Sequence, residues 1–390
     1  MKDYIKSKIL FLILFISLLL NSCTLLKNKF YEGLYSPLKP TKKFSTTLPF
    51  TVLNGKIFIE IQLEEEKYRF LFDTGSSNYI SKDVRNKLKL YNPYDSTRSI
   101  DFEGEVKLVE QIRLDLKLNS LNIYNARFKV ADIISQECDK IDGVFGSELL
   151  NQGYFHFDNK NKLLTISNSI EMINLKEYTR INFKKDLGVI KLKIKRRKYV
   201  LDTGFNGFIM NDIGRGAEKE YPFCYHQVVV VGLNGGVNKN IYYKADSLKI
   251  DNLKYSGIVN GLKDLNYNLI GGKWFLQNDV IINSNQKELF IKKHTTDSNN
   301  YSEAILKFNI DYLDSLSIIN GIVKSDFELD NYDIILSINE FSFNNITSKC
   351  ELRERLKQID FTKPIKIEIL RNNQRKIIIV EKSYFFFDKN

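Results

Sequence analysis

Two aspartates end apolar segments of the sequence and are the residues best suited to chemistry. Asp73 closes the run RFLFD and Asp202 closes the run YVLD, and each begins an Asp-Thr-Gly triplet. A carboxylate is costly to bury unless it is paired or hydrogen-bonded. Two carboxylates that lie close together can share one proton and act as general acid and general base. The alternative is that both are buried turn aspartates that only cap loops.

Both triplets follow the same kind of strand pair. The segments GKIFIEIQLEEEKYRFLFDTG and GVIKLKIKRRKYVLDTG each hold alternating apolar and polar residues, then a charged turn, then a second apolar run. Alternation with a period of two is typical of a half-buried β-strand, and two such runs joined by a short turn predict a hairpin. Each aspartate is therefore expected at the end of the second strand of a hairpin.

The sequence after each triplet also repeats. The segment DGVFGSELLNQGYFHFDNKNKLLTI follows Asp73, and NLIGGKWFLQNDVIINSNQKELFI follows Asp202 at a similar distance. Each contains two apolar residues and a glycine, then a short helical step, then two strands around a polar turn. These landmarks recur in the same order, which indicates an internal duplication of an all-β unit. We expect the two copies at residues 48–172 and 178–294.

A glycine-containing hairpin is expected between the landmarks of each copy. The residues of interest there are Phe102 and Gly104 in the first copy and Leu233 and Gly235 in the second. Glycine permits a tight turn and a mobile tip. The pattern alone fits an ordinary surface hairpin equally well.

The two triplets, each followed by an apolar-apolar-Gly element, resemble the pepsin and retropepsin superfamily of aspartic peptidases. The resemblance covers residues 48–294. It implies a mostly β fold with two pseudo-symmetric retropepsin-like β-barrel lobes, which form a pseudo-dimer within one chain, so that a monomer suffices. It also implies that Asp73 and Asp202 activate a water molecule to attack a peptide bond of a protein or peptide substrate. No metal and no cofactor are expected.

The same resemblance assigns supporting roles to the residues of the two loops. Thr74 and Thr203 are expected to cross-bond the loops. Gly75 and Gly204 are expected to let the backbone approach closely, so that amides can hydrogen-bond the carboxylates.

One position differs between the two loops. Ser76 could bond the outer oxygen of Asp73, whereas Phe205 at the matching position of the second copy cannot make that bond. Further along the chain, the elements that end at Gly146 and Gly271 are expected to pass beneath the loops. The four hairpin residues above would form a flap and its counterpart over an extended substrate.

The N-terminus has the composition of an export signal. MKDYIKSK is basic, residues 9–20 are apolar, and the tetrapeptide LNSC ends at Cys23. The apolar run is shorter than the roughly 20 residues of a membrane-spanning helix, and its flanks predict a secretory signal. LNSC resembles the lipobox of bacterial lipoproteins. This implies removal of residues 1–22, lipidation of Cys23, a tether at 23–47 and a place on a bacterial cell-envelope membrane. An uncleaved signal anchor is the alternative.

The last third of the chain is predicted to be separate. Residues 295–303 are polar and are interpreted as a linker, and residues 304–384 are expected to form short strands, one helix and a closing hairpin. The run DIILSIN from Asp333 resembles the signature of PDZ domains, with Tyr332 in place of the usual glycine. A small, β-rich PDZ-like domain is implied, with its carboxylate-binding loop near residues 311–316. Peptide binding at a sheet edge and a packing-only role both remain open.

The composition of the chain is that of a globular protein, and its charge does not favour nucleic-acid binding. The chain has 390 residues, 43% of them hydrophobic, and a net charge of +11. Its basic residues are scattered, and the densest run, KIKRRKY, is a predicted hairpin turn, so a solvated face is favoured over a nucleic-acid site. No metal-ligand cluster is evident among the histidines, which are His156, His226 and His294. An odd number of cysteines besides Cys23 leaves at least one thiol free; they are Cys138, Cys224 and Cys350. A Cys138–Cys224 bridge stays open.

Two functions therefore compete. The first is a membrane-anchored aspartic endopeptidase, which the two intact triplets favour. The second is a catalytically inactive envelope lipoprotein that binds peptides or proteins, which the Phe205 position and the acidic segment 311–316 favour.

Overall fold

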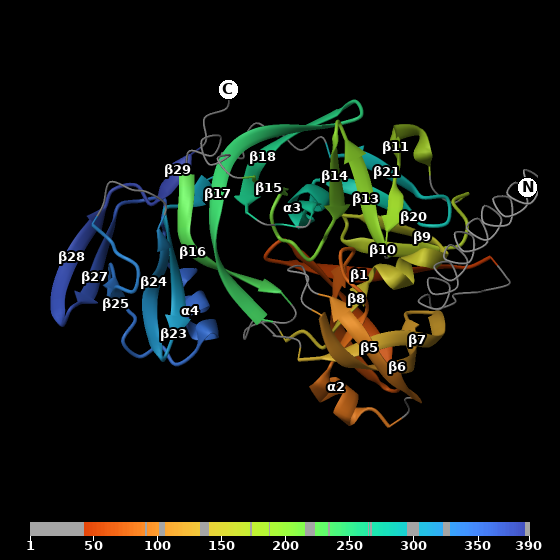
Figure 1. Cartoon of the computed structure of the whole chain (residues 1–390), viewed down its shortest axis with the longest axis horizontal. Coiled ribbons are helices and arrows are strands. Elements are labelled where there is room, and N and C mark those ends of the chain that lie inside the picture. Colours follow the sequence, from red (N-terminus) through yellow and green to blue (C-terminus); the bar gives the residue numbers. More distant parts are fainter. Residues whose placement is uncertain are drawn as a thin grey trace, which may run out of the picture.

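The computed structural model describes residues 43–89, 92–100, 106–132, 140–171, 174–186, 188–214, 223–232, 235–263, 265, 267–294, 304–322 and 328–386. Strands make up most of these residues and helices are few, which confirms the mostly β class (Figure 1). The expected signal peptide, Cys23, most of the tether and the linker at 295–303 lie outside the described residues.

The first half of the chain contains a six-stranded barrel. The elements of this part of the chain are β1 (Ser45–Leu53), β2 (Lys56–Leu63), β3 (Glu66–Asp73), β4 (Tyr79–Ser81), α2 (Lys82–Lys87), β5 (Asn92–Ile100), β6 (Val106–Leu118), β7 (Leu121–Ala131) and β8 (Gly143–Gly146). A β2–β6 pairing closes the order β2-β3-β8-β4-β7-β6 into a ring. The predicted alternation of β2 holds for Ile57, Ile59 and Ile61, which are buried, and for Glu60, which is exposed. It is wrong for Phe58, which is buried in a smaller cluster on the other face.

The second half forms an eight-stranded sheet in the order β12-β13-β14-β19-β15-β18-β17-β16. Its strands are β12 (Lys184–Asp186), β13 (Val189–Ile194), β14 (Arg197–Leu201), β15 (Ile209–Asp212), β16 (Phe223–Gly232), β17 (Gly235–Ile250), β18 (Leu253–Leu262) and β19 (Asn268–Ile270). Both predicted hairpins, β2–β3 and β13–β14, are present. Their two-residue turns hold Glu64 and Lys195 at positive φ.

Strand pairing around the two triplets follows one pattern. β3 is parallel to β8, and β14 is parallel to β19. A short strand then pairs antiparallel with each of these partners: β4 with β8, and β15 with β19. The same short strands run parallel to β7 and β18 respectively. Each aspartate is thus held at the end of a strand that has neighbours on both sides.

A sheet made from both halves joins them. Its strands run in the order β11-β21-β20-β9-β10-β1. They are β9 (Tyr154–Asp158), β10 (Leu163–Ser167), β11 (Thr179–Asn182), β20 (Asn278–Asn283) and β21 (Glu288–Lys293), together with β1. The short helices η1 (Ser147–Gln152), η2 (Leu175–Glu177) and α3 (Gly272–Leu276) lie between these strands in the sequence. The connection between the halves is the antiparallel β9–β20 pair, in which Phe157 faces Val280. Both side chains are fully buried in the main core.

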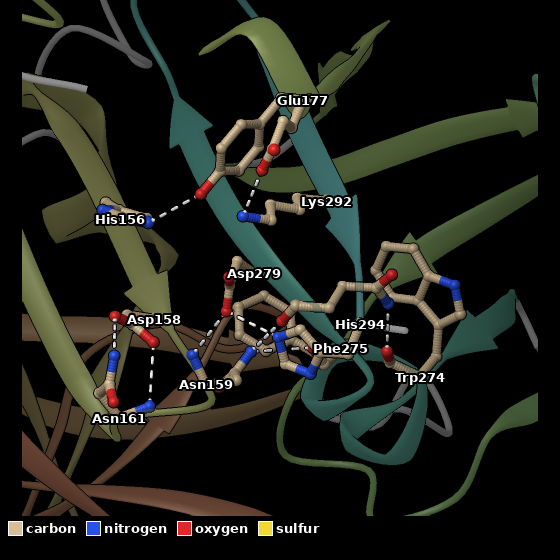
Figure 2. Close-up of polar contacts among 12 residues, drawn as sticks. His156, Asp158, Asn159, Asn161, Glu177, Trp274, Phe275, Asp279, Lys292 and His294 are labelled. Carbon is tan, nitrogen blue, oxygen red and sulfur yellow. Dashed lines mark hydrogen bonds and ion pairs between the residues drawn. The ribbon is translucent and has the colours of Figure 1, made fainter. Parts of the chain in front are cut away.

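Figure 2 shows the polar contacts at this joint. Asp279 Oδ1 accepts a hydrogen bond from the backbone N–H of Asn159 over 3.0 Å and lies 2.7 Å from His294 Nε2. Asn159 also donates from its side chain to the carbonyl oxygen of Phe275 over 3.0 Å. His156, on the facing strand, lies within the electrostatic influence of the same Asp279. His294 therefore contacts Asp279 directly, whereas His156 Nε2 lies 3.1 Å from the hydroxyl oxygen of Tyr178.

The C-terminal region has its own hydrophobic core. Its elements are β22 (Ala304–Leu306), β23 (Phe308–Leu313), β24 (Leu316–Ile322), β25 (Ile334–Ile338), β26 (Phe341–Ser342), α4 (Lys349–Leu356), β27 (Ile365–Arg371), β28 (Gln374–Val380) and β29 (Tyr384–Phe386). The predicted short strands, helix and β27–β28 hairpin are all present. Figure 1 shows this region on one side of the molecule, with β16 of the second half next to β24.

Two turns of the C-terminal region bear on the predicted PDZ-like features. Residues 311–316 do not form an open loop, because β23 continues to Leu313 and a two-residue turn leads directly into β24. The turn residues Asp314 and Ser315 both have positive φ, which suits a tight hairpin. Tyr332, at the position where glycine was expected, has a φ of 72°, so the backbone there keeps the conformation that favours glycine.

Candidate active site

The structure brings Asp73 and Asp202 together at the ends of their strands. Asp73 is the last residue of β3 and pairs with Gly146 of β8. Asp202 follows β14 directly, and its backbone N–H donates to Ile270 O over 2.9 Å. The two carboxyl groups are hydrogen-bonded to each other. The pair is therefore positioned by the same parallel strand contact in both halves.

The glycines of the triplets are what allow this approach. A Cβ placed on Gly75 would lie 2.7 Å from Asp202 Cγ, and a Cβ on Gly204 would lie 2.3 Å from Asp73 Oδ2. Each glycine thus lies against the aspartate of the other half. Both positions exclude any side chain, so the expected close backbone approach is present at each of them.

The threonines cross-link the two loops. Thr74 Oγ1 donates to Leu201 O and Thr203 Oγ1 donates to Phe72 O, each over 2.7 Å. Both threonines are fully buried. Because each hydroxyl reaches the strand of the opposite half, the distance between the aspartates is set by buried contacts.

Backbone amides bind the two carboxylates unequally. Gly75 N–H donates to Asp73 Oδ1 over 2.8 Å. Asp202 Oδ1 accepts two such bonds, from Gly204 N–H over 3.0 Å and from Phe205 N–H over 3.1 Å. Hydrogen bonds from amides favour the ionised form of a carboxyl group. Asp202 is consequently the better stabilised anion of the pair.

Burial raises the pKa of both aspartates, because protein atoms surround their carboxyl groups closely. For Asp73, the negative charge of Asp202 raises the pKa further, and it lies well above the usual range. For Asp202, the hydrogen bond from Asp73 and the two amide bonds act in the opposite direction to burial. The pair therefore holds a proton more readily than two solvated aspartates do, and the amide bonds favour the anion at Asp202.

Gly146 and Gly271 lie directly against the loops that begin with the two aspartates. A Cβ on Gly146 would lie 2.3 Å from the carbonyl carbon of Ser77, and one on Gly271 would lie 2.3 Å from Gly207 O. The next residue in each half donates its N–H to the loop, from Ser147 over 2.8 Å and from Gly272 over 2.6 Å. These glycines therefore support the loops from one side.

Ser76 and Phe205, which occupy matching positions of the two loops, each donate a backbone N–H to the preceding aspartate. Ser76 N–H donates to Asp73 O over 3.4 Å, and its own carbonyl accepts from Ser147. The Phe205 ring packs against Gly207, whose Cβ would lie 2.2 Å from it. That ring joins a small apolar cluster around Met210. The apolar side chain is thus accommodated in the second half, and its N–H still binds Asp202.

Asn78 is a loop residue that the sequence analysis missed. It is 1% exposed, and its Oδ1 accepts from Gly146 N–H over 2.8 Å. Its Nδ2 donates to Arg127 O over 3.1 Å and to Glu148 Oε2 over 3.4 Å. The sequence signal was its place three residues after Gly75, but nothing in the pattern showed which segments it would join.

Glu148 and Lys56 are charged neighbours that were also missed. Burial raises the pKa of Glu148 to about 7, although Lys129 and a hydrogen bond from Ser77 act against this. Lys56 lowers the pKa of both Asp73 and Asp202 through its positive charge. It follows Gly55, whose Cβ would lie 3.1 Å from Asn206 O of the other half. The first half therefore places a cation near the pair, where the second half has Val189.

The predicted flap residues are only partly described. Phe102, Gly104 and Leu233 lie outside the described residues. Gly235 begins β17 and pairs with Gly232 at the tip of the β16–β17 hairpin. The matching hairpin of the first half, β5–β6, is present up to the pair Ile100 and Val106. Both expected hairpins are therefore present.

The remaining candidate features are the cysteines, metal ligands and membrane-spanning helices. Cys350 lies in the first turn of α4 and is half-buried, and Cys138 lies outside the described residues. Within the ranges given above, no three or more His, Cys, Asp or Glu side chains are arranged to hold a metal ion. Of the helices in those ranges, none has the length and hydropathy to cross a bilayer.

Comparisons with known proteins do not place the chain in a family. It matches no protein-family model, and a search of curated proteins found no match.

Proposed function

We propose that the chain is an aspartic endopeptidase that hydrolyses peptide bonds with a water molecule held between Asp73 and Asp202. The observation that supports it most strongly is the shared hydrogen bond between the two carboxyl groups, each of which lies against the glycine of the other triplet. Two half-buried acids in contact with each other are costly to the fold. A module that only binds peptides has no need of such a pair.

The protonation of the pair fits general acid–base catalysis. Asp202, the ionised partner, removes a proton from water, and the water oxygen attacks the carbonyl carbon of the substrate. Asp73 donates its proton to the developing oxyanion. In the second step Asp202 passes its proton to the amide nitrogen while Asp73 takes one from the diol. The C–N bond breaks, and the acid and amine products leave the pair in its starting state.

The repeated strand pairing supports two pseudo-symmetric retropepsin-like lobes, one in each half of the chain. In this proposal the β5–β6 and β16–β17 hairpins are the flap and its counterpart. The C-terminal region is a PDZ-like domain, and Cys23 is a lipid anchor on a bacterial envelope membrane. The tether would hold the peptidase near that surface, where its protein or peptide substrates lie.

A second candidate is an inactive lipoprotein that binds envelope peptides or proteins. The observation in its favour is the asymmetry of the loops, where the Phe205 ring packs into an apolar cluster while Ser76 has no such anchor. The tight turn at Asp314 and Ser315 weakens the case for a carboxylate-binding loop in the C-terminal region.

Cleavage of an unbiased peptide library decides between them. The chain from Thr24 is assayed from acid to mildly alkaline pH beside Asp73→Asn, Asp202→Asn and the control Asp251→Asn, which changes an exposed turn residue. We expect activity in the wild type and the control and none in the other two. A folded wild type that cuts nothing at any pH would favour the binding lipoprotein.

A further inference from the structure

β28 is an edge strand whose outer side is free among the described residues. It ends the sheet order β23-β24-β25-β27-β28 and pairs only with β27. Figure 1 shows it at the far side of the C-terminal region, away from both halves of the candidate peptidase. Ile377 and Ile379 are 59% and 52% exposed on this strand. Unpaired backbone groups at such an edge are a template for another strand.

The register of the β27–β28 hairpin shows which backbone groups face outward. Its turn is Asn372 and Asn373, both at positive φ, so Arg371 and Gln374 form the first hydrogen-bonded pair. In an antiparallel ladder, hydrogen-bonded and non-hydrogen-bonded pairs alternate. The N–H and C=O groups of residues 374, 376, 378 and 380 therefore face β27. Those of residues 375, 377 and 379 face the free edge, and Glu381 is the first residue after the strand.

The side chains of these outward residues are self-complementary. In order they are Arg375, Ile377, Ile379 and Glu381, all of them exposed. If two copies of β28 lie antiparallel with Ile378 opposite its own copy, Arg375 faces Glu381 and Ile377 faces Ile379, each twice. Arg375, Ile377 and Ile379 also supply the outward hydrogen-bonding groups of the strand. Backbone and side-chain complementarity thus agree in a single register.

We propose that β28 is an interface through which two copies of this chain pair antiparallel, so that one continuous sheet crosses a two-fold axis. Displacing one strand by two residues would put Arg375 opposite an isoleucine or beyond the strand, and both Arg–Glu pairs would be lost. The loss of both ion pairs therefore disfavours the shifted register. The interface is closed, because the same patch is used on both copies.

Arg375 is available for this contact. Its present ion pair is with Glu368 across the hairpin, over 3.3 Å, and its side chain is 74% exposed. An exposed pair of this kind contributes little to stability. The Arg375 guanidinium can therefore turn to Glu381 of the second copy at little cost. Lys376, the neighbouring cation, belongs to the alternate set of β28 residues.

The proposal does not depend on peptidase activity. The expected monomer concerned an active site that is complete within one chain, and pairing at β28 leaves that site unchanged. One strand pair buries a small area, so association of the chain from Thr24 should be modest. Two chains held on one membrane by the expected lipid anchor would have a higher effective concentration.

Sedimentation equilibrium over a concentration series that reaches the millimolar range tests the proposal on the chain from Thr24. We expect a monomer–dimer equilibrium that Arg375→Glu and Glu381→Arg each weaken by about tenfold or more, since like charges then face each other twice. An equimolar mixture of the two variants should associate again, as should the double swap in one chain. The control Lys366→Glu reverses an exposed charge on β27 and should associate like the wild type.

A backbone variant gives a second test that does not rely on charge. Ile377→Pro removes an N–H that faces the free edge and none that bonds β27, so the fold should persist while the dimer is lost. Thermal unfolding of this variant checks the fold. A wild type that stays monomeric throughout the series, or a dimer that neither single reversal weakens, would overturn the proposal. Failure of the mixed variants to associate would overturn it as well.

Discussion

Thr74 and Thr203 are hydrogen-bonded to each other in both directions. The N–H of Thr74 donates to Thr203 Oγ1 over 3.1 Å, and the N–H of Thr203 donates to Thr74 Oγ1 over 3.2 Å. Each hydroxyl then donates onward to a carbonyl of the opposite half, at Leu201 and Phe72. Neither residue is exposed. The two loops are therefore a single buried hydrogen-bonded unit.

Thr74→Val should reveal how much this unit contributes to stability. Valine has nearly the same shape, but it leaves Leu201 C=O and Thr203 N–H buried without their partner, which costs about 2–5 kcal/mol. We expect a loss of that order in the free energy of unfolding, measured with urea. Thr74→Ser keeps the hydroxyl and should lose less. Equal unfolding midpoints for Thr74→Val and the wild type would contradict the cross-link.

The aspartate pair should make the fold less stable as the pH rises. The pKa of Asp73 is raised well above that of an unfolded chain, where aspartate titrates near about 4. A carboxyl group of this kind contributes its stability below the unfolded pKa and loses it as pH rises through the folded pKa. Asp73→Asn removes the titration of this one carboxyl group. The melting temperature of Asp73→Asn relative to wild type should therefore increase from acid to neutral pH.

A methyl group between the loops should abolish activity without removing any acid. In Gly204→Ala the new Cβ would lie 2.3 Å from Asp73 Oδ2, so the carboxyl groups must separate. Gly214→Ala is the matched control, because nothing lies within 4 Å of a Cβ there. We expect peptide cleavage to fall at least about a hundredfold in the first variant, since misplacing catalytic groups has effects of this size. Gly214→Ala should cleave at the wild-type rate.

Much of the fold followed from local pattern. The alternation in β2 and the charged turns at Glu64 and Lys195 were enough to predict two hairpins, because burial on one face imposes a period of two. The position of each aspartate at the end of a strand followed from the same pattern. The meeting of Asp73 with Asp202 required more, namely the duplication of the whole unit.

Contacts that join three or more segments could not be predicted. Asn78 connects its loop to β8 and β7 through bonds with Gly146 and Arg127, and that meeting depends on tertiary packing. Asn159 and His294 meet at Asp279 because of the β9–β20 register. The prediction of a loop at residues 311–316 was wrong for a local reason. Asp314 adopts positive φ without being glycine, so the tight turn had no glycine signal.

Glu148 offers a test of the polar cluster behind the Asp73 loop. Burial raises its pKa from 4.5 to about 7. Its contribution to stability is thus complete below pH 4.5 and is lost as the pH rises through about 7, by up to about 3 kcal/mol. Glu148→Gln keeps a similar shape and cannot titrate. Over that interval, the stability of Glu148→Gln relative to wild type should rise with pH.

The slope with pH is the quantity to measure, because Glu148→Gln also removes a counter-charge from Lys129 and changes the absolute stability. Urea unfolding at several pH values between 4.5 and 7 provides it. Glu171→Gln is the control, since Lys43 lowers the pKa of that exposed glutamate. That variant should show no rise relative to wild type in the same interval. Parallel curves for Glu148→Gln and the wild type would mean that Glu148 titrates like a solvated glutamate and that its burial next to Asn78 has no electrostatic consequence.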